Sequence, residues 1–357
     1  FEFIDPFHGK YAIEKQMIIS VGNAKERFTE DSLRIMRAIR FAAQLGFTVS
    51  SETMNAISET RELLNNVSAE RIRDEFVKII NSEAPAIALF HMKQLDLLEI
   101  ILPEIIPSIG CEQGGVHIYD VFDHLVHALQ HAADKKFLFH IRLAALFHDI
   151  GKPKTRRAGI KKAYTFYGHE VVGARIAQKI MERLKFPKAE TELVVKFVRW
   201  HMFFSDTESI TLSAVRRMIA NVGTEHIWEL MQIRECDRVG MNKTEAPYRL
   251  RKYFAMIEEC LRDPISVSQL KVDGTYLMKD LGVKPGPRMG WMLHALLEEV
   301  LENPEKNTIE YLSDRVKNFE QLSDVDLKKL GEAGKERKEQ EEQEEVKKLH
   351  VKHNVKK

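Results

Sequence analysis

A helical hydrophobic period runs through nearly the whole of this 357-residue chain and limits its fold more than any other feature. From Thr29 to about Leu330, apolar residues return every three or four positions, the spacing of amphipathic helices. Only residues 1–21 carry a strand signal, with one strand at the start, turns at Asp5-Pro6 and His8-Gly9, and a second strand from Met17 to Val21. The sequence therefore predicts a mainly α fold with a short β segment at its beginning.

Local signals set the expected helix ends in the first third of the chain. Thr29 is predicted to cap a helix that Gly46 ends, with two acids in its first turn where the helix dipole favours anions. Further helices are expected over residues 51–65, from a cap at Ser68 to Ile80, and from Pro85 onward.

Breaks in the period divide the chain into segments. Residues 110–115 are predicted to be a linker loop, and Asp263-Pro264 interrupts the pattern again. Residues 331–357 are almost wholly Lys, Arg, Glu and Gln, so we expect a solvated helix or a disordered tail. The predicted segments are residues 1–28, 29–110, 111–262, 263–330 and 331–357.

Composition excludes few classes of function. The formal net charge is +1, so any nucleic-acid surface must be local. Three scattered cysteines fit a reducing cytoplasm better than a disulfide framework, and no apolar run is long enough to span a membrane. Because the sequence opens on Phe1 inside an apolar run, we expect it to be a fragment of a longer protein.

Three arginines recur at intervals of three in the stretch RFTEDSLRIMRAIRFAAQLGF, at Arg34, Arg37 and Arg40. On a helix Asp31 and Arg34 are neighbours, whereas Arg40 points away from Asp31. Asp31 and Arg34 could read a base edge while Arg37 or Arg40 meets phosphate or ties the helix to the protein. The alternative is a set of helix-terminal acids and internal salt bridges.

The sequence IDPFHGKYAIEKQMIISVGNAKERFTEDSLRIMRAIRFAAQLGF resembles the end of the catalytic head and the start of the neck of bacterial CCA-adding tRNA nucleotidyltransferases and related poly(A) polymerases. The resemblance covers residues 1 to about 330. It implies that the Glu-Asp-x-x-Arg motif at Glu30, Asp31 and Arg34, with Arg37 and Arg40 after it, recognises CTP or ATP without a nucleic-acid template. It also implies a head remnant over residues 1–28, a neck over 29–110 that binds nucleotide and RNA, and a tRNA-contacting region over 263–330.

Two further features follow the family only in part. VSAERIRDE resembles the motif whose Arg71 and Glu75 brace the nucleotide-reading helix, although by spacing alone they are a surface pair at i and i+4. His8 stands where the family's turn has Gly, so this turn is expected to be altered. The Asp-x-Asp pair that holds two Mg²⁺ ions for nucleotidyl transfer is absent in a suitable context, so we expect this chain alone not to transfer nucleotides.

Histidines and aspartates recur between residues 119 and 240 in the order typical of the HD phosphohydrolase superfamily, whose fold is a helical bundle. His148 and Asp149 end an apolar helix before Gly151, and Lys152 follows. Nitrogen and carboxylate ligands suit Mn²⁺, Ni²⁺, Fe, Zn²⁺ or Mg²⁺, and the sequence does not choose among them. The resemblance implies a first metal at His124, His148, Asp149 and Asp237, a second supported by His169 and His201, and His148 and Asp149 as the catalytic pair. A retained fold with a degraded site is the alternative.

Basic residues cluster after this motif, and they would suit phosphates of RNA or of a phosphoester, or form a solvated loop. They are Lys152, Lys154, Arg156 and Arg157. Downstream, Gly286-Pro287 is predicted to start an amphipathic helix whose apolar face includes Met292 and Val300.

Three hypotheses follow. The first is an enzyme that adds CCA, or A alone, to tRNA with CTP and ATP and carries an accessory HD phosphohydrolase domain. The second is a stand-alone HD phosphohydrolase with a helical extension, and the third is a non-catalytic RNA-binding scaffold. The Glu-Asp-x-x-Arg motif favours the first, since a free-standing HD enzyme has no use for it. The oligomeric state stays open.

Overall fold

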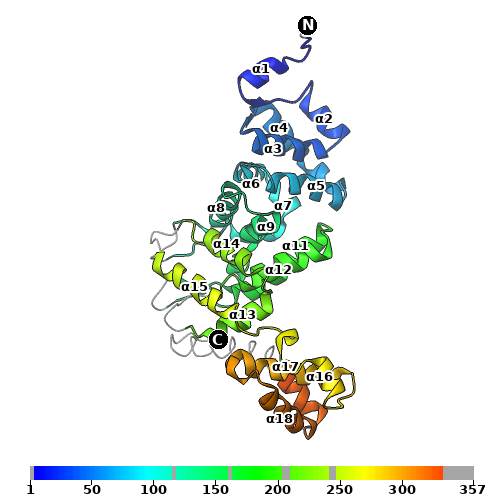
Figure 1. Cartoon of the computed structure of the whole chain (residues 1–357). Helices are drawn as coiled ribbons and strands as arrows, with labels where there is room; N and C mark the ends of the chain where they lie inside the picture. Colours follow the sequence, from blue (N-terminus) through cyan, green and yellow to red (C-terminus); the bar gives the residue numbers. More distant parts are fainter. Residues whose placement is uncertain (1–3, 115–117, 160–162, 203–209, 241–246, 333–357) are drawn as a thin grey trace. The chain divides into compact units, whose positions relative to one another are not determined.

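The structure is a computed structural model that describes residues 4–114, 118–159, 163–202, 210–240 and 247–332. The described part is mainly helical, as the hydrophobic period predicted (Figure 1). It divides into two compact units: unit 1 holds residues 1–202 and 228–243, and unit 2 holds residues 203–227 and 244–357. The boundaries between these two units differ from those of the five predicted segments, and the five segments stay a prediction. Within the described ranges, we find no helix of the length and apolarity that crossing a membrane requires.

The first residues of unit 1 contain a helix that was not expected, between the predicted turn at His8-Gly9 and the predicted second strand. α1 (Gly9–Glu14) precedes β1 (Met17–Ile18), which pairs in parallel with β2 (Thr48–Val49). The predicted second strand is thus confirmed in shorter form, and most of the predicted first strand lies outside the described residues. His8 has a φ of 57°, and Asp5 accepts hydrogen bonds from the backbone of Gly9 and Lys10. The turn therefore keeps a left-handed residue although His replaces Gly.

The predicted cap at Thr29 is wrong, because two helices replace the one expected. α2 (Ala24–Glu30) starts at Asn23, whose side chain accepts from the backbone of Glu26, and Thr29 lies inside it. Asp31 is extended, with a φ of −146°, and its carboxylate accepts from the backbone of Leu33 at the start of α3 (Leu33–Leu45). Gly46 ends α3 in a left-handed conformation, as predicted.

Among the remaining N-terminal helices, α5 and α6 pack against α3, and α4 packs against α2. Ser68 accepts from the backbone of Arg71 and starts the next long helix, and Pro85 starts another, both as predicted. Residues 51–65, predicted as one helix, form an α-helix followed by a 3-10 turn. The elements are α4 (Ser51–Thr60), η1 (Arg61–Asn66), α5 (Ala69–Ile80), α6 (Pro85–Gln94), α7 (Leu98–Ile101) and η2 (Pro103–Ser108).

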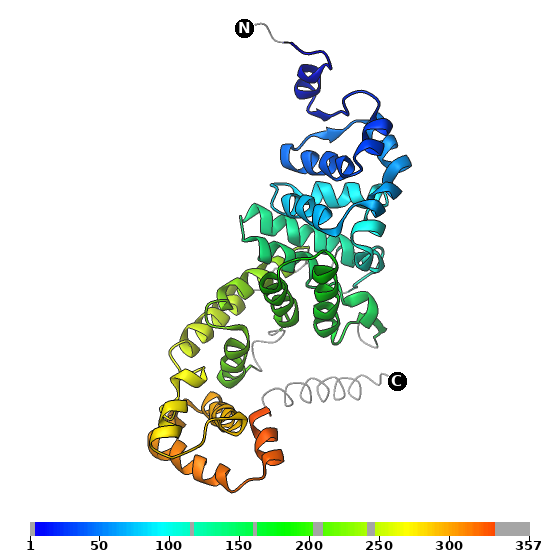
Figure 2. The same cartoon turned by 90° about the vertical axis from the view of Figure 1, so that its right-hand side faces the viewer.

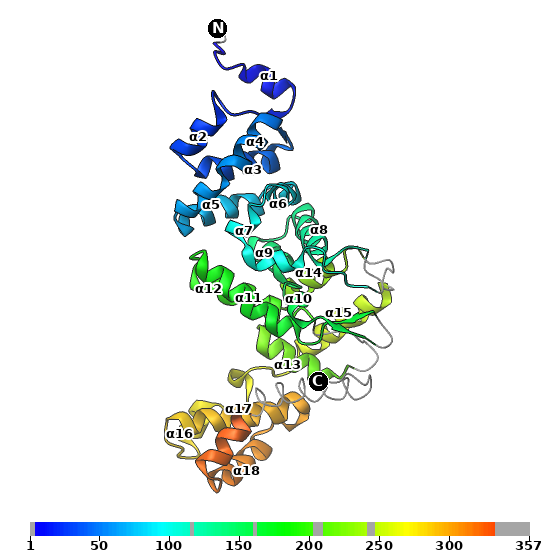
Figure 3. The same cartoon turned by 180° about the vertical axis from the view of Figure 1, so that it is seen from behind.

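The rest of unit 1 is a bundle with a small hairpin at its side. α8, α9 and α12 supply a continuous apolar core, and α11 and α12 lie side by side (Figures 1 and 3). The hairpin, β3 with β4, was not predicted. The elements are α8 (Val121–Asp134), α9 (Phe139–Phe147), α10 (Lys152–Thr155), β3 (Arg157–Ala158), β4 (Tyr164–Thr165), α11 (His169–Arg183), α12 (Lys188–Trp200) and α14 (Ile227–Asp237).

Unit 2 is built around α17, which begins after Gly286 as predicted (orange in Figure 2). Its apolar face, including Met292 and Val300, is buried against α13, α16 and α18. The elements are α13 (Leu212–Val222), α15 (Pro247–Cys260), η3 (Val267–Gln269), α16 (Gly274–Lys279), α17 (Pro287–Glu302), η4 (Pro304–Lys306) and α18 (Ile309–Glu320).

Candidate functional sites

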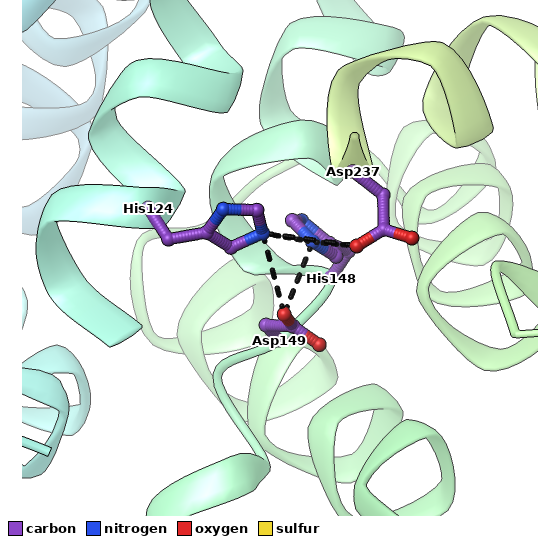
Figure 4. Close-up of side chains that lie close together, drawn as sticks. All are labelled: His124, His148, Asp149 and Asp237. Atoms are coloured by element: carbon purple, nitrogen blue, oxygen red, sulfur yellow. Dashed lines mark hydrogen bonds and ion pairs between the residues drawn. The ribbon is translucent and has the colours of Figure 1, made fainter. Parts of the chain in front are cut away.

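Six side chains from five stretches of unit 1 meet in one buried group, which we call the histidine–aspartate cluster. Each is at most 4% exposed. Figure 4 shows the four that form its first half, converging from three helices. The structure thus brings together all six candidates that the sequence singled out. They are His124 on α8, His148 and Asp149 after α9, His169 at the start of α11, His201 after α12, and Asp237 at the end of α14.

Backbone carbonyls fix the orientation of every imidazole in the cluster. A carbonyl oxygen only accepts, so each Nδ1 must carry a proton, and each Nε2 is the ring atom left to bind a proton or a metal. This is how proteins prepare histidines for a metal. The Nδ1 contacts are His124 to Val239 O at 3.1 Å, His148 to Ala145 O at 2.8 Å, His169 to Phe166 O at 2.7 Å and His201 to Val198 O at 2.7 Å.

Asp149 joins the two halves of the cluster, because each of its oxygens faces a different half. Oδ2 lies 3.4 Å from His124 Nε2 and 3.3 Å from His148 Nε2. Oδ1 lies 3.1 Å from His169 Nε2 and 3.5 Å from His201 Nε2. Asp237 Oδ1 completes the first half, 3.3 Å from His148 Nε2. Within each half the potential ligand atoms lie within 4.8 Å of one another.

The residues present fit a pair of divalent cations. Nε2 of His124 is 3.1 Å from Nε2 of His148, and the same distance is 3.2 Å between His169 and His201. Two lone pairs at such distances repel unless a proton or a cation lies between them. Both oxygens of Asp149 are buried and accept no hydrogen bond of good geometry from the described residues, although Lys152 forms an ion pair with Oδ2. One cation in each half would satisfy all these atoms at once, with the nitrogen and oxygen ligands that Mn²⁺, Fe, Ni²⁺ and Zn²⁺ accept.

Charge coupling keeps the carboxylates of the cluster ionised. Burial opposes the charged form of Asp149, but Lys152 and His148 hold the pKa of its carboxyl well below the ordinary value. Burial also opposes ionisation of Asp237, and Arg234 leads the contacts that hold its pKa low. Burial alone would lower the pKa of His148, yet the charges of Asp149 and Asp237 raise it to about 10. The two buried carboxylates are therefore balanced by Lys152, Arg234 and the proton on His148, and a bound cation would replace that proton.

Lys152 does not belong to an exposed phosphate-binding loop, so this part of the predicted basic cluster is wrong. Its side chain is buried, with Nζ 2.5 Å from Asp149 Oδ2 and 2.7 Å from Oε1 of Gln113. Gln113 is itself buried and donates to the backbone carbonyls of Tyr119 and Asp120. Sequence reasoning missed Gln113, since no local pattern links a loop glutamine to a helix 39 residues later.

The other predicted loop cations lie around the β3–β4 hairpin. The Arg156 guanidinium stacks over the ring of Tyr164, 3.6 Å from its centroid, and Arg157 is exposed and donates to the carbonyl of Arg156. Lys154 is exposed on α10. Arg156 is thus held in place, while Lys154 and Arg157 are accessible from solvent.

Gly151 allows the turn after His148-Asp149 to pack directly on the start of α11. A Cβ atom at this position would lie 2.1 Å from the carbonyl oxygen of His169 and 2.6 Å from the nitrogen of Gly173. Backbone atoms cannot yield as a flexible side chain can, so glycine is required for this contact. The close approach links the two halves of the cluster.

A second candidate site is a cleft of about 370 Å³ beside α3 in unit 1. Three arginines line it: Arg27, Arg34 and Arg37. Its apolar wall includes Phe28 and Phe41, and residues 18–21 also contribute to the lining. The sequence predicted Arg34 and Arg37 at this site but missed Arg27 and the strand residues, which tertiary packing brings to it.

Acidic partners hold the polar residues around this cleft. Glu30 accepts from Arg34 at 2.7 Å and from Arg27 at 3.0 Å, and both arginines lower the pKa of its carboxyl. Asp31 accepts from Arg71 at 3.2 Å. Neither acid lines the cleft itself. The structure therefore places Arg34 and Arg37 in the lining of the cleft, and Glu30 and Asp31 outside that lining.

Arg40 and Glu75 form a buried connection between α3 and α5. Arg40 Nε donates to Glu75 Oε2 over 2.6 Å. The surface pair of Arg71 with Glu75 that spacing predicted is wrong, because Glu75 is only 5% exposed and Arg71 reaches Asp31 instead. Arg40 does not line the cleft, but its guanidinium lies 4.2 Å from the centroid of the Phe41 ring, which does. Glu75 thus holds α3 through Arg40, and Arg71 holds Asp31, two residues before α3 begins.

The chain matches two family descriptions and several characterised proteins. Residues 46–109 match "Probable RNA and SrmB- binding site of polymerase A", and residues 116–241 match the HD domain. The chain is 32% identical over 298 residues to the CC-adding tRNA nucleotidyltransferase of Thermus thermophilus. This match covers 81% of this chain and 67% of that protein. It is 31% identical over 314 residues to the A-adding tRNA nucleotidyltransferase of Deinococcus radiodurans, with 83% and 69% covered.

The fold is also similar to that of a solved enzyme. The Bacillus stearothermophilus CCA-adding enzyme in complex with CTP aligns with a TM-score of 0.60 at 22% identity, over 89% of this chain and 70% of that one. At this identity the likeness concerns the fold alone.

Proposed function

Because this chain belongs to the tRNA nucleotidyltransferase family, we propose that it serves the addition of CCA, or of A alone, to tRNA 3′ ends from CTP and ATP. The observation that carries the proposal is the cleft beside α3, which Arg34, Arg37 and the apolar ring of Phe41 line together. A base can lie against the apolar wall while guanidinium groups contact its polar edge and the phosphates.

Within this proposal the residues around the cleft have separate roles. Arg34, held by Glu30, reads the base edge from the lining of the cleft. Asp31, held by Arg71 outside that lining, is the acceptor for a base edge that extends beyond the cleft. Arg37 is exposed at the cleft and meets the triphosphate. Arg40 does not contact nucleotide but fixes the helix through Glu75. Residues 29–110 would then form the nucleotide- and RNA-binding segment, and residues 263–330 would contact tRNA.

Calorimetric titration of the chain with ATP and with CTP tests the nucleotide site. We expect Arg34→Ala to weaken both affinities by about tenfold or more, because a charged hydrogen bond contributes roughly 1.5–3 kcal/mol. Arg61→Ala is the matched control, since Arg61 is a partly exposed arginine of the same unit outside the cleft. A wild-type chain that takes up neither nucleotide, or an Arg34→Ala variant that binds both normally, would reject the assignment.

A second function is supported by the geometry of the histidine–aspartate cluster, namely phosphoester hydrolysis. When bound, divalent ions at such ligands lower the pKa of a coordinated water and polarise a phosphoester. The chain's own contribution is to hold four Nε2 lone pairs in fixed directions, to keep Asp149 and Asp237 ionised, and to join both halves through Asp149. The metal is one of Mn²⁺, Ni²⁺, Fe, Zn²⁺ or Mg²⁺.

Metal reloading of chelated protein tests this second function. Hydrolysis of bis(p-nitrophenyl) phosphate should return with one of these ions and be lost in His148→Ala. His294→Ala is the control, because His294 is exposed on α17 outside the cluster. No uptake of any of these ions by the wild type would reject a live site.

The cellular location is proposed from cysteine chemistry. Cys111, Cys236 and Cys260 are all buried free thiols. Free thiols persist in the reducing cytoplasm, where tRNA maturation would require the protein.

A further inference from the structure

A groove of about 380 Å³ runs along the outer side of the α11–α12 pair in unit 1. α11 contributes the stretch from Val171 to Gln178, and α12 contributes the stretch from Glu192 to Trp200. Seven residue steps of helix are about 10 Å long, so the lining extends over about that length of α11. Nothing in the proposed nucleotide site or in the histidine–aspartate cluster uses these residues.

The groove and the cluster lie on opposite sides of the same two helices. Gln178 comes nine residues after His169, and at about 100° per residue it points away from that ligand. Glu192 comes nine residues before His201 and is displaced in the same way. Figures 1 and 3 show α11 and α12 side by side, so one shared outer face carries the groove. The lining of the groove contains none of the six cluster residues, although Trp200 directly precedes His201 in the chain.

The lining of the groove is cationic and aromatic. Arg175, Lys196 and Arg199 line it together with a single carboxylate, Glu192. Arg199 also lies 3.9 Å from Glu170, so cations still exceed acids when this neighbour is counted. Trp200 stands at one end, with the Arg199 guanidinium 5.9 Å from its ring. Such a combination attracts an anion that also has a flat apolar face.

We propose that this groove binds an unpaired segment of RNA, with phosphates on Arg175 and Lys196 and a base against Trp200. Arginine and lysine beside an aromatic ring are the means by which proteins hold single-stranded nucleic acid without reading its sequence. An acidic protein segment would satisfy the cations but would leave the indole face and the apolar Val171 and Val195 without a matching group. The inference rests on the proposed function, because tRNA is the RNA that the family binds.

Salt-dependent binding tests the proposal. The probes are a tRNA transcript that lacks its 3′ CCA end and a ten-nucleotide oligouridine. In Arg175→Gln/Lys196→Gln we expect affinity for both probes to fall about tenfold at 0.1 M salt. The slope of log K against log salt should fall in magnitude by about 1.4 with oligouridine, since each lost phosphate contact contributes about 0.7. Trp200→Leu should weaken binding, and Trp200→Phe should restore most of it because a ring remains.

Lys135→Gln is the matched control, because Lys135 is a half-exposed lysine after α8 and outside the groove. Circular dichroism verifies that each variant is folded. Unchanged affinity and slope in the double variant, or an equal loss in Lys135→Gln, would reject RNA binding in the groove. If ATP binding stays normal in that case, the proposed function is unaffected. A wild-type chain that binds ATP but neither RNA would overturn both the groove and the tRNA partner.

Discussion

The side chain of Arg40 on α3 donates through Nε to Oε2 of Glu75 on α5 over 2.6 Å, and the two side chains are only 11% and 6% exposed. The other oxygen of Glu75 accepts from Lys78 over 2.9 Å. This pair fixes how α3 lies against α5, and α3 in turn carries the arginines of the cleft. A buried ion pair of this kind holds a geometry more than it adds stability.

Removing one partner of that pair should destabilise the protein strongly. We expect Glu75→Ala to lower the free energy of unfolding by about 3 kcal/mol, because Arg40 would stay buried without its counter-charge. Glu59→Ala is the control: its ion pair with Lys25 is 58% exposed on the glutamate side and should contribute below about 1 kcal/mol. Urea unfolding measures both. Equal effects would show that the buried pair has no special role.

Arg37 should separate phosphate contact from base contact. We expect Arg37→Ala to weaken ATP binding about tenfold and to leave adenosine binding nearly unchanged, because a guanidinium group at the open side of the cleft meets charge rather than the base. Competition titrations with both ligands give the two affinities. Equal losses for ATP and adenosine would instead mean that Arg37 contacts the base or shapes the cleft.

Asp149 should control both metal positions, whereas single histidines should control one. Asp149→Asn keeps the shape of the side chain but removes its charge, and we expect both ions to be lost. His169→Ala should lose only the ion of the second half, since its Nε2 faces Oδ1 of Asp149 and His201. Elemental analysis after dialysis gives metal per chain. A single ion retained in Asp149→Asn would contradict the bridging position.

Gly151→Ala should disrupt the turn after the His148-Asp149 pair. The added methyl group would meet the backbone of His169 and Gly173 at impossible distances, so either the turn or the start of α11 must move. We expect a loss of several degrees in Tm and weaker metal binding. Gly290→Ala in α17 meets nothing within 4 Å and should stabilise by a few tenths to about 1 kcal/mol. A neutral Gly151→Ala would show that this contact is looser than the structure indicates.

Cys260 should make the protein less stable at alkaline pH. Burial raises the pKa of its thiol from 9.0 to about 11. The folded state therefore holds this proton more tightly than the unfolded chain. The resulting stabilisation is complete below pH 9 and is lost as pH rises toward 11. Thermal unfolding from pH 8 to 11 measures the loss, and Cys260→Ala should make it smaller. An identical pH profile in that variant would assign the loss to other groups.

The local sequence determined the helical class, the cap at Ser68, the helix start at Pro85, the stop at Gly46 and the apolar face of α17. Periodicity and capping act over a few residues, so they can be read from the chain directly. The sequence also predicted all six members of the histidine–aspartate cluster, because the types and the order of these residues are typical of the HD superfamily. The cap at Thr29 failed because Asn23 and Asp31 offered competing helix signals within the same stretch.

Only the tertiary structure decided which side chains meet. The partner of Arg71 is Asp31 and not Glu75, the partner of Glu75 is Arg40, and Lys152 turns inward to Gln113 and Asp149. Likewise, the groove on α11 and α12 exists because the packing of two helices aligns their cations on one face. Such contacts join residues up to tens of positions apart, and their energies depend on burial and orientation, which no local pattern in the sequence encodes.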